Sequence, residues 1–302
     1  MTRPAIDVVV PFVGTDGELR ETLAHFRALS LGPEDSLTLV DNRPVAMSAP
    51  PPEVVAAPER QSSYFARNAG ARIGSNPWLL FLDADVRAPA DLLDLYLDGY
   101  EPPNDVGVLA GGITTTLASS TAVARYGYAA QQLSPRYAAR AGHEYAQTAN
   151  AAFRRAGFEQ VGGFFDRVRS GGDADMSFRM ADAGWRLERR HDAAVEHPSR
   201  ASLRALLRLF ARYGSGAEWV RGRHPGFRPP QSRAGLSRWL LRGLVQGAVS
   251  YARGERDEAT RLVLDPATRL AFELGRSFPN EVDAPPPANL SERLLRRAAR
   301  IG

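Results

Sequence analysis

The segment WLLFLDADV at residues 78–86 constrains the fold more than any other, because it is an apolar run that ends in two carboxylates. The run is long enough for one buried strand, and its continuous apolar character is typical of a parallel sheet covered on both faces. In open α/β sheets, ligands bind just beyond the carboxyl ends of the strands. We therefore expect Asp83 and Asp85 at a ligand-binding edge, where carboxylate oxygens hold a hard divalent cation and, through it, a diphosphate. Taken alone, an Asp after a strand is as typical of a helix N-cap or a turn.

The other segments alternate between strand and helix patterns, which indicates βαβ units and a parallel sheet. Apolar runs predict further strands at residues 6–10, 37–40 and 106–110. Capping patterns and helical spacing predict one helix that begins at Thr15. Further helices are predicted at 67–73, at 119–132, within FRRAGFEQVGGF, and at 173–183. The Pro-rich segment 44–58 predicts a loop. Polar residues follow the first three strands, so we expect them to meet at one edge of the sheet.

After Pro198 the pattern becomes helical. We predict an amphipathic helix after residue 202, a Gly/Pro/Arg linker at 222–235, and further helices near 236–252 and 256–277. The last segment, SERLLRRAARIG, predicts a short basic amphipathic helix. A boundary between two regions is therefore expected close to residue 200.

Composition excludes several chemistries. All 38 basic residues are Arg, so no mechanism that needs a Lys nucleophile, a Schiff base or a P-loop lysine is possible. The chain has no Cys, which excludes disulfides and thiolate metal sites. No apolar stretch reaches the roughly 18 residues of a transmembrane helix, and the N-terminus lacks a signal-peptide pattern, so we expect a cytoplasmic protein.

The positive charge is concentrated in the C-terminal third. Residues 1–198 carry 19 Arg and 25 acidic residues, whereas residues 199–302 carry 19 Arg and 9 acidic residues. Two interpretations stay open: a solvated helix face that also contacts the acidic N-terminal region, or peripheral docking on an anionic membrane, at its inner face. Nucleic acid is not expected as a partner, because the basic segments lack interleaved aromatic residues for base stacking.

Five blocks, in this order, resemble family 2 glycosyltransferases of the GT-A fold. They are PFVG, VDN, ARNAGARIGSNPWLLFLDADV, TANAAFRRAGFEQVGGF and GGDADMSFRMADAGWRL, which together lie within roughly residues 5–200. The resemblance implies an α/β GT-A (Rossmann-like) fold, with three layers and a mostly parallel sheet, followed by a C-terminal helical extension. It divides the chain into a GT-A domain at 1–200, with a nucleotide-sugar half at 1–86 and an acceptor half at 106–198, and a basic helical region at 201–302.

The same resemblance implies an activity. A sugar passes from a UDP-, GDP- or dTDP-sugar to a hydroxyl acceptor, with inversion and with Mn²⁺ or Mg²⁺. The processive members' Gln-x-x-Arg-Trp motif is absent, which favours a single addition. A lipid-linked or other cell-envelope acceptor would suit the basic C-terminal region.

Residue roles follow from matching positions. The residues implied to contact the nucleotide sugar are Pro11, Phe12, Val13, Asp41, Arg67, Asp83, Ala84 and Asp85. Asp85 matches the family's metal ligand, and His197 stands where several members place a metal-binding His, with His191 as the competing candidate. Asp173 matches the catalytic base, and a carboxylate suits this role because an acceptor hydroxyl needs a positioned base. Asp175 and Arg179 stand at i, i+4, and we expect a structural pair.

Departures from the family pattern leave other functions open. The second strand ends in Asp41-Asn42-Arg43-Pro44 rather than the commoner Asp-Asp-Gly-Ser, so the nucleobase is not specified, and Gly172 replaces a frequent acidic residue. A catalytically degenerate GT-A binding module is one alternative. A nucleotidyltransferase is disfavoured by the lack of a Gly-rich basic phosphate loop. A haloacid-dehalogenase-like phosphatase is disfavoured by the position of the Asp-x-Asp motif and the lack of Lys.

Overall fold

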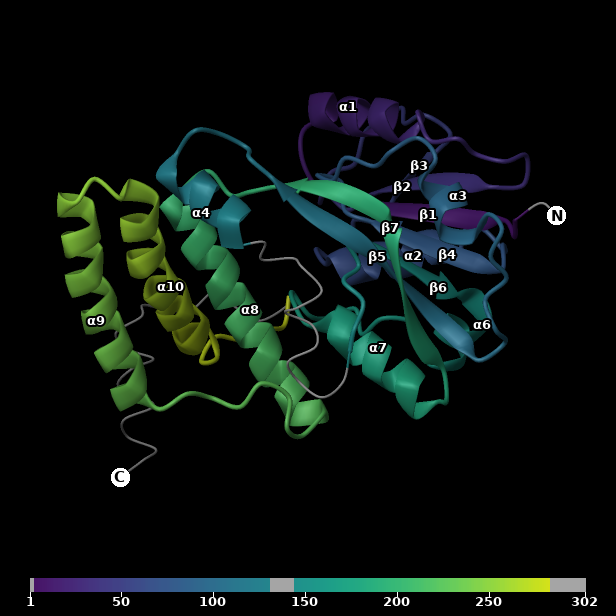
Figure 1. The fold of residues 1–302 in the computed structure, drawn as a ribbon. Helices are drawn as coiled ribbons and strands as arrows, with labels where there is room; N and C mark the ends of the chain where they lie inside the picture. Colours follow the sequence, from purple (N-terminus) through teal and green to yellow (C-terminus); the bar gives the residue numbers. More distant parts are fainter. Residues whose placement is uncertain (1–2, 131–143, 283–302) are drawn as a thin grey trace.

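The computed structural model describes residues 3–130 and 144–282 (Figure 1). In chain order, the elements are β1 (Ile6–Phe12), α1 (Asp16–Phe26), β2 (Ser36–Asp41), β3 (Val54–Ala56), α2 (Ser63–Ala71), β4 (Trp78–Leu82), α3 (Leu92–Leu97), β5 (Val106–Thr116), α4 (Ala122–Ala130), β6 (Asn150–Arg154), α6 (Arg155–Gln160), α7 (Gly172–Asp182), β7 (Arg186–Pro198), α8 (Leu203–Arg223), α9 (Arg233–Ala252) and α10 (Arg256–Gly275). The predicted C-terminal helix in SERLLRRAARIG lies outside the described residues, as do the last two residues of the helix predicted at 119–132.

A seven-stranded sheet organises the first two thirds of the chain, in the order β3-β2-β1-β4-β6-β5-β7. Every strand pair is parallel except the two made by β6, which runs antiparallel to β4 and to β5. The predicted mostly parallel sheet is therefore confirmed. In the register of β1 and β2, Phe12 pairs with Asp41. Because β1 is also parallel to β4, the carboxyl ends of these three strands meet at one edge.

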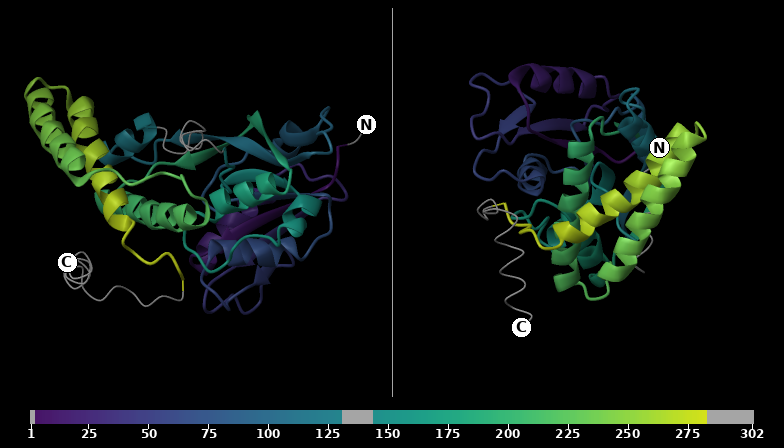
Figure 2. Two further views of the ribbon diagram at one scale, coloured as in Figure 1. Left: turned by 90° about the horizontal axis from the view of Figure 1, so that it is seen from below. Right: turned by 90° about the vertical axis from the view of Figure 1, so that its left-hand side faces the viewer.

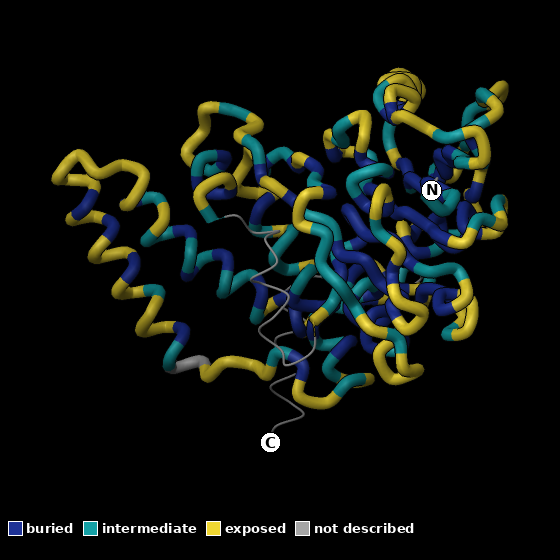
Figure 3. The backbone as a smooth tube through the Cα atoms, turned by 45° about the vertical axis from the view of Figure 1, so that its right-hand side comes forward, coloured by how far each residue is buried: buried dark blue, intermediate teal, exposed yellow. Residues whose placement is uncertain are grey.

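Helices cover both faces of the sheet, which gives the three predicted layers (Figure 1). Along β1 the buried side chains alternate: Val8 and Val10 pack in the cluster that contains α1 and α3, whereas Val9 packs in the cluster that contains α2, α6 and α7. Because successive side chains of a strand point to opposite faces, a strand covered by helices on both faces needs an apolar residue at every position. Figure 3 shows the buried residues concentrated in this part of the molecule.

The C-terminal helices form a second body beside the carboxyl edge of the sheet (Figures 1 and 2). α8 and α10 pack closely, because a side chain at Gly214 or at Gly275 would overlap with the backbone of the other helix. α4 belongs to this body as well, since Tyr126 forms one buried cluster with Leu206 of α8 and Leu264 of α10. Within the described residues, no helix is both long enough and apolar enough to cross a membrane.

The described elements differ from the sequence predictions at two helices and three strands. α3 was not predicted, and α2 begins at Ser63 rather than at Arg67. β3 lies inside the segment predicted as a loop, where Val54 and Val55 extend the edge of β2. The short strand β6 and the long strand β7 were not predicted. β7 is charged at many positions (RLERRHDAAVEHP) and forms the edge of the sheet, so it lacks the apolar pattern by which the central strands are recognised.

Candidate active site

Main-chain hydrogen bonds tie the loop after β4 to β7. The N–H of Arg87 donates to the carbonyl of Glu196 at 2.7 Å, and the N–H of Glu196 donates back to the carbonyl of Arg87 at 2.9 Å. Val86 is completely buried and anchors the same loop. Since Asp85 and His197 are close in sequence to the two bridged residues, this pairing holds their side chains next to each other.

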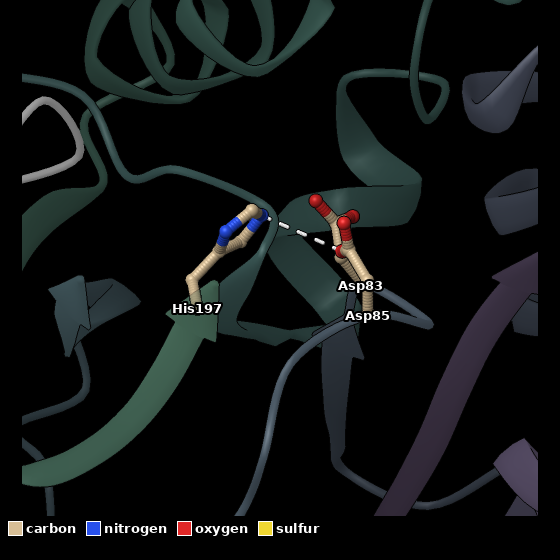
Figure 4. Close-up of side chains that lie close together, drawn as sticks. All are labelled: Asp83, Asp85 and His197. Atoms are coloured by element: carbon tan, nitrogen blue, oxygen red, sulfur yellow. Dashed lines mark ion pairs between the residues drawn. The ribbon is translucent and has the colours of Figure 1, made fainter. Parts of the chain in front are cut away.

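Asp83, Asp85 and His197 form a group in which one ligand atom of each residue lies within 4.8 Å of the others (Figure 4). His197 Nε2 is 3.4 Å from Asp85 Oδ1. On the other side of the ring, His197 Nδ1 is 3.1 Å from the carbonyl oxygen of Pro198. In the neutral tautomer that donates from Nδ1 to this carbonyl, the lone pair of Nε2 faces the two carboxylates.

This donor set fits a divalent cation. The two carboxylates are ligands that Mn²⁺ and Mg²⁺ prefer, the neutral imidazole is a common ligand of transition-metal ions, and three protein ligands leave further coordination positions open. Arg200 adds positive charge at the same place, because its Nη1 lies 3.6 Å from Asp85 Oδ2. Arg200 was not assigned to this site from the sequence, although its position just after His197-Pro198 indicated that it would lie near the metal ligands. His191 is exposed and is not part of the group found among the described residues.

Arg67 lies beneath the carboxylates. It is buried and forms an ion pair with Asp83, and its guanidinium carbon is 5.6 Å from the ring centroid of Tyr64. Its Nε is buried and has no hydrogen-bond partner among the described residues. The charge of Asp83 is thereby partly neutralised by Arg67. The side chain of Asp85, in contrast, is 45% exposed to solvent.

The residues expected to contact the nucleobase lie together at the ends of β1 and β2. Val13 is 69% exposed, Phe12 is buried, and the guanidinium of Arg43 lies over the Phe12 ring at 5.9 Å. Both oxygens of Asp41 are already occupied: Arg43 donates from Nε at 2.7 Å and from Nη2 at 2.6 Å, and the N–H of Met47 donates at 3.1 Å. Burial opposes the ionisation of Asp41, but these hydrogen bonds outweigh it and lower its pKa. The sequence did not show that Arg43 would cover this carboxylate.

Asp173 is the second residue of α7. Its Oδ1 accepts a hydrogen bond from the N–H of Ala174 at 3.0 Å and one from the Tyr64 hydroxyl at 3.4 Å. Burial raises the pKa of Asp173; the Ala174 hydrogen bond and the charge of Arg67 act against this rise, and the charge of Asp83 adds to it. Asp173 is thus electrostatically coupled to the carboxylate edge and has a higher proton affinity than an ordinary Asp.

Asp175 has a structural environment. Its side chain is fully buried and pairs with Arg179 at 2.9 Å, which confirms the expected i, i+4 pair. Arg223, at the end of α8, and His224 approach the other carboxylate oxygen at 2.7 and 3.1 Å. Asp175 therefore joins α7 to α8 and fixes the start of the helix that carries Asp173. No role was predicted for His224.

Comparisons with known proteins agree with this fold. A family model described as glycosyl transferase family group 2 matches residues 78–254. A pre-mycofactocin glycosyltransferase of Mycobacterium tuberculosis is 28% identical over 251 residues, which cover 80% of this chain and 53% of that protein. Glycosyltransferase AglE of Haloferax volcanii is 32% identical over 168 residues, which cover 54% of this chain and 53% of that protein. The chain therefore spans about half the length of these curated relatives.

One solved structure extends the comparison to nearly the whole chain. It is the mannosyltransferase PcManGT from Pyrobaculum calidifontis in complex with GDP-Man and Mn²⁺, with a TM-score of 0.51 and 15% sequence identity. The match covers 99% of this chain and 81% of that chain. At this identity the likeness shows the fold, which is the GT-A fold with a helical C-terminal part.

Proposed function

Because the chain belongs to glycosyl transferase family group 2, we propose that it transfers a sugar from a nucleotide-sugar donor to an acceptor hydroxyl. The observation that carries this proposal is the group of Asp83, Asp85 and His197 at the carboxyl edge of the sheet, with Asp173 electrostatically coupled to it. The curated relatives named above are glycosyltransferases, and the solved mannosyltransferase is a complex with GDP-Man and Mn²⁺.

We propose that donor binding depends on a divalent metal. Asp85 and His197, with Asp83 beside them, would hold Mn²⁺ or Mg²⁺, and the bound ion would neutralise charge on the departing diphosphate. Arg200 stands where it would contact the same phosphates. The exposed Val13 and the Asp41 region would receive the nucleobase, and Ala84 would lie under the sugar-diphosphate. UDP, GDP and dTDP remain the candidate nucleotides.

Asp173 is our candidate for the catalytic base. Its carboxylate would take the proton of the acceptor hydroxyl while the hydroxyl oxygen attacks the anomeric carbon and the bond to the diphosphate breaks, which gives inversion. A pKa raised by burial makes Asp173 a stronger base than an exposed carboxylate. Holding donor and acceptor aligned supplies much of the remaining rate enhancement.

We further propose the division into a donor half at 1–86, an acceptor half at 106–198 and a basic helical region at 201–302. The acceptor would be lipid-linked or part of the cell envelope, would receive a single sugar, and would be reached by peripheral contact between the Arg-rich C-terminal helices and an anionic membrane. This proposal is supported by the excess of 19 Arg over 9 acidic residues in 199–302.

Turnover of the full chain tests the activity. UDP-, GDP- and dTDP-sugars are incubated with the protein and Mn²⁺, and the release of nucleoside diphosphate is measured for the wild type and Asp85→Ala. We expect slow hydrolysis of one donor, and none in the variant. Nucleotide binding without any turnover would favour the degenerate binding module. Release of pyrophosphate from a nucleoside triphosphate and a sugar phosphate would favour a nucleotidyltransferase.

A further inference from the structure

α9 is the outermost helix of the C-terminal body (Figures 1 and 3). One of its faces packs on α10, where a Cβ at Gly247 would come within 2.8 Å of Val263. Its other side carries large apolar residues that stay about half exposed or more: Leu241, Leu244, Val245 and Val249 are 65%, 49%, 57% and 46% exposed. At about 100° per residue these four side chains fall on one side of the helix, away from α10. We call them the α9 strip.

Unpaired arginines border the α9 strip. α9 contains no acidic residue, and Arg238, Arg242 and Arg253 form no ion pair with any described residue. The acidic residues Glu258 and Asp265 of neighbouring α10 are already paired with Arg261. In a two-fold dimer through the strip, the α9 helices of the two copies would face each other with arginines and no acidic residue of α9 to pair them. An anionic membrane instead offers phosphates to the arginines and an acyl boundary to the apolar side chains.

We propose that α9 lies in the interface of an anionic membrane, with the α9 strip turned toward the acyl chains and Arg238 and Arg242 at the lipid phosphates. This deepens the membrane contact proposed above, because it assigns the contact to one helix and adds apolar insertion to charge attraction. It does not depend on glycosyl transfer, so its failure and that of the activity are distinguishable. Insertion predicts that salt weakens the binding but does not abolish it, because salt screens the charges and not the apolar burial.

Vesicle flotation of the full chain tests this proposal. Phosphatidylglycerol vesicles should bind the protein, phosphatidylcholine vesicles should bind it far less, and part of the binding should persist in 0.5 M NaCl. The double variant Leu241→Asp/Val245→Asp should lose about tenfold or more in affinity, since it replaces two apolar side chains that membrane binding would bury. Leu31→Asp, at an exposed leucine on the sheet domain, is the matched control and should bind like the wild type.

Three results would overturn the proposal. They are unchanged vesicle binding by the α9 double variant, equal binding to the two lipids, and a lipid-free dimer that the double variant converts to a monomer. The last result would assign the strip to a second copy. Because both substituted residues are exposed, the variant should keep its far-UV circular dichroism and melting temperature.

A second inference concerns Tyr64 and rests on different contacts. A Cβ at Gly172 would lie 2.8 to 2.9 Å from three ring atoms of Tyr64, so any larger residue at 172 displaces this ring. The ring is buried, packs against Phe164 with 5.5 Å between centroids, and lies under the guanidinium of Arg67. Its hydroxyl reaches Asp173 Oδ1 at 3.4 Å.

We infer that Tyr64 is a positioning residue for Asp173, whose hydroxyl holds the carboxylate in the orientation that accepts the acceptor's proton. This inference rests on the proposed function. Burial raises the pKa of Tyr64, so the phenol stays protonated and its O–H donates to the ionised carboxylate. The present distance is longer than the roughly 2.8 Å of a good O–H···O bond, and we expect it to shorten when the acceptor binds.

The charged and titratable groups around Asp173 come from several elements. They are Tyr64 and Arg67 on α2, Asp83 after β4, Tyr145 before β6 and Tyr213 on α8. Of these, the described hydrogen bonds join only Tyr64 to the Asp173 side chain. Removing its hydroxyl should therefore raise the pKa of Asp173, because the ionised carboxylate loses a donor.

Tyr64→Phe keeps the ring and tests the hydroxyl alone. We expect kcat to fall about tenfold, the acid limb of its pH profile to move upward, and KM for the donor to stay unchanged. Wild-type kcat with an unmoved pH profile, or a raised KM with unchanged kcat, would overturn the inference. If the wild type shows no turnover, the proposed function fails first. The carboxyl pKa of Asp173 measured by ¹³C NMR still decides this inference, because it should rise in the variant.

Discussion

The environment of Asp173 destabilises the ionised form of its carboxylate and thereby makes this carboxylate a stronger base. The Asp173 side chain is half-buried and its pKa is raised by burial, although the N–H of Ala174 and the cation of Arg67 both favour its charged form. In a protein this destabilisation of the ionised state is tolerated where a base is needed. The stability and the activity should therefore respond to its substitution in opposite directions.

Asp173→Asn should increase the melting temperature and reduce sugar transfer roughly 10²–10⁴-fold. The folded-state pKa of Asp173 lies above its unfolded value, so the wild type loses stability as the pH rises through that folded pKa. Asn does not titrate, hence the two melting curves should agree near pH 4 and separate toward pH 8. Wild-type transfer should rise over the same pH range. A variant that is active, or that is less stable at pH 8, would contradict this account.

Asp175 shows the opposite balance two residues away. Burial acts to raise the pKa of Asp175, but the interactions with Arg223, Arg179 and His224 outweigh burial and lower this pKa. Because the folded pKa is depressed, the pairing stabilises the protein above the unfolded pKa, and this contribution is lost as the pH falls through the folded pKa.

Asp175→Ala should lower the free energy of unfolding by about 1–3 kcal/mol, since it removes the buried carboxylate that accepts from Arg179, Arg223 and His224, whose own side chains are 21%, 40% and 18% exposed. Asp257→Ala is the matched control: its ion pair with Arg125 is 72% exposed on the Asp side, and its loss should cost no more than about 1 kcal/mol. Urea unfolding at pH 7 measures both. Equal effects of the two substitutions would show that Asp175 does not join α7 to α8.

At the scale of elements, α2 is held against the sheet by a glycine. A Cβ at Gly70 would overlap with Val9 of β1 and lie 2.9 Å from Val40 of β2. α2 carries Tyr64 and Arg67 into the site, so its close approach to the strands sets the depth of both side chains.

Gly70→Ala should destabilise the protein by about 1–3 kcal/mol and weaken activity, because the helix must move away from two buried valines. Gly222→Ala, near the end of α8, meets no neighbouring atom and should stabilise the protein by up to about 1 kcal/mol. Thermal unfolding and kcat separate these cases. A neutral Gly70→Ala variant would mean that the α2 contact with the sheet is not tight.

The same scale shows what the sequence predicts and what it does not. β1, β2 and β4 are apolar runs between two helix layers, so pattern alone predicts them, and the capping box of Thr15 and Glu18 is confirmed at the start of α1. β7 escapes prediction because an edge strand tolerates charge on its exposed positions. The position of α4 among the C-terminal helices could not be predicted either, because it depends on packing between residues far apart in the sequence.

The residues of the site also fall into those that the sequence predicts and those that it does not. Asp83, Asp85 and Asp173 occupy a strand end and a helix start, positions that a local pattern identifies. The contact of Arg200 with Asp85, the ring of Tyr64 behind Gly172, and the coverage of Asp41 by Arg43 depend on side-chain orientations across distant segments. No local sequence pattern specifies those orientations.

At the scale of the whole molecule, the helical body lies beside the edge of the sheet that carries the site (Figure 1). Asp175 links α7 to α8, and Arg200, just before α8, reaches Asp85. The site is therefore bounded by both parts of the chain.

We propose that this edge of the sheet binds a nucleoside diphosphate through a divalent ion held by Asp85 and His197. A thermal-shift panel of UDP, GDP, dTDP and CDP, each with and without Mn²⁺, tests it most directly on the wild type and Asp85→Ala. A ligand at 100 times its Kd stabilises the native state by about 2.7 kcal/mol. We expect one nucleotide to raise the melting temperature only with Mn²⁺, and no rise in the variant. No shift with any nucleotide, or a metal-independent shift that Asp85→Ala retains, would contradict the claim.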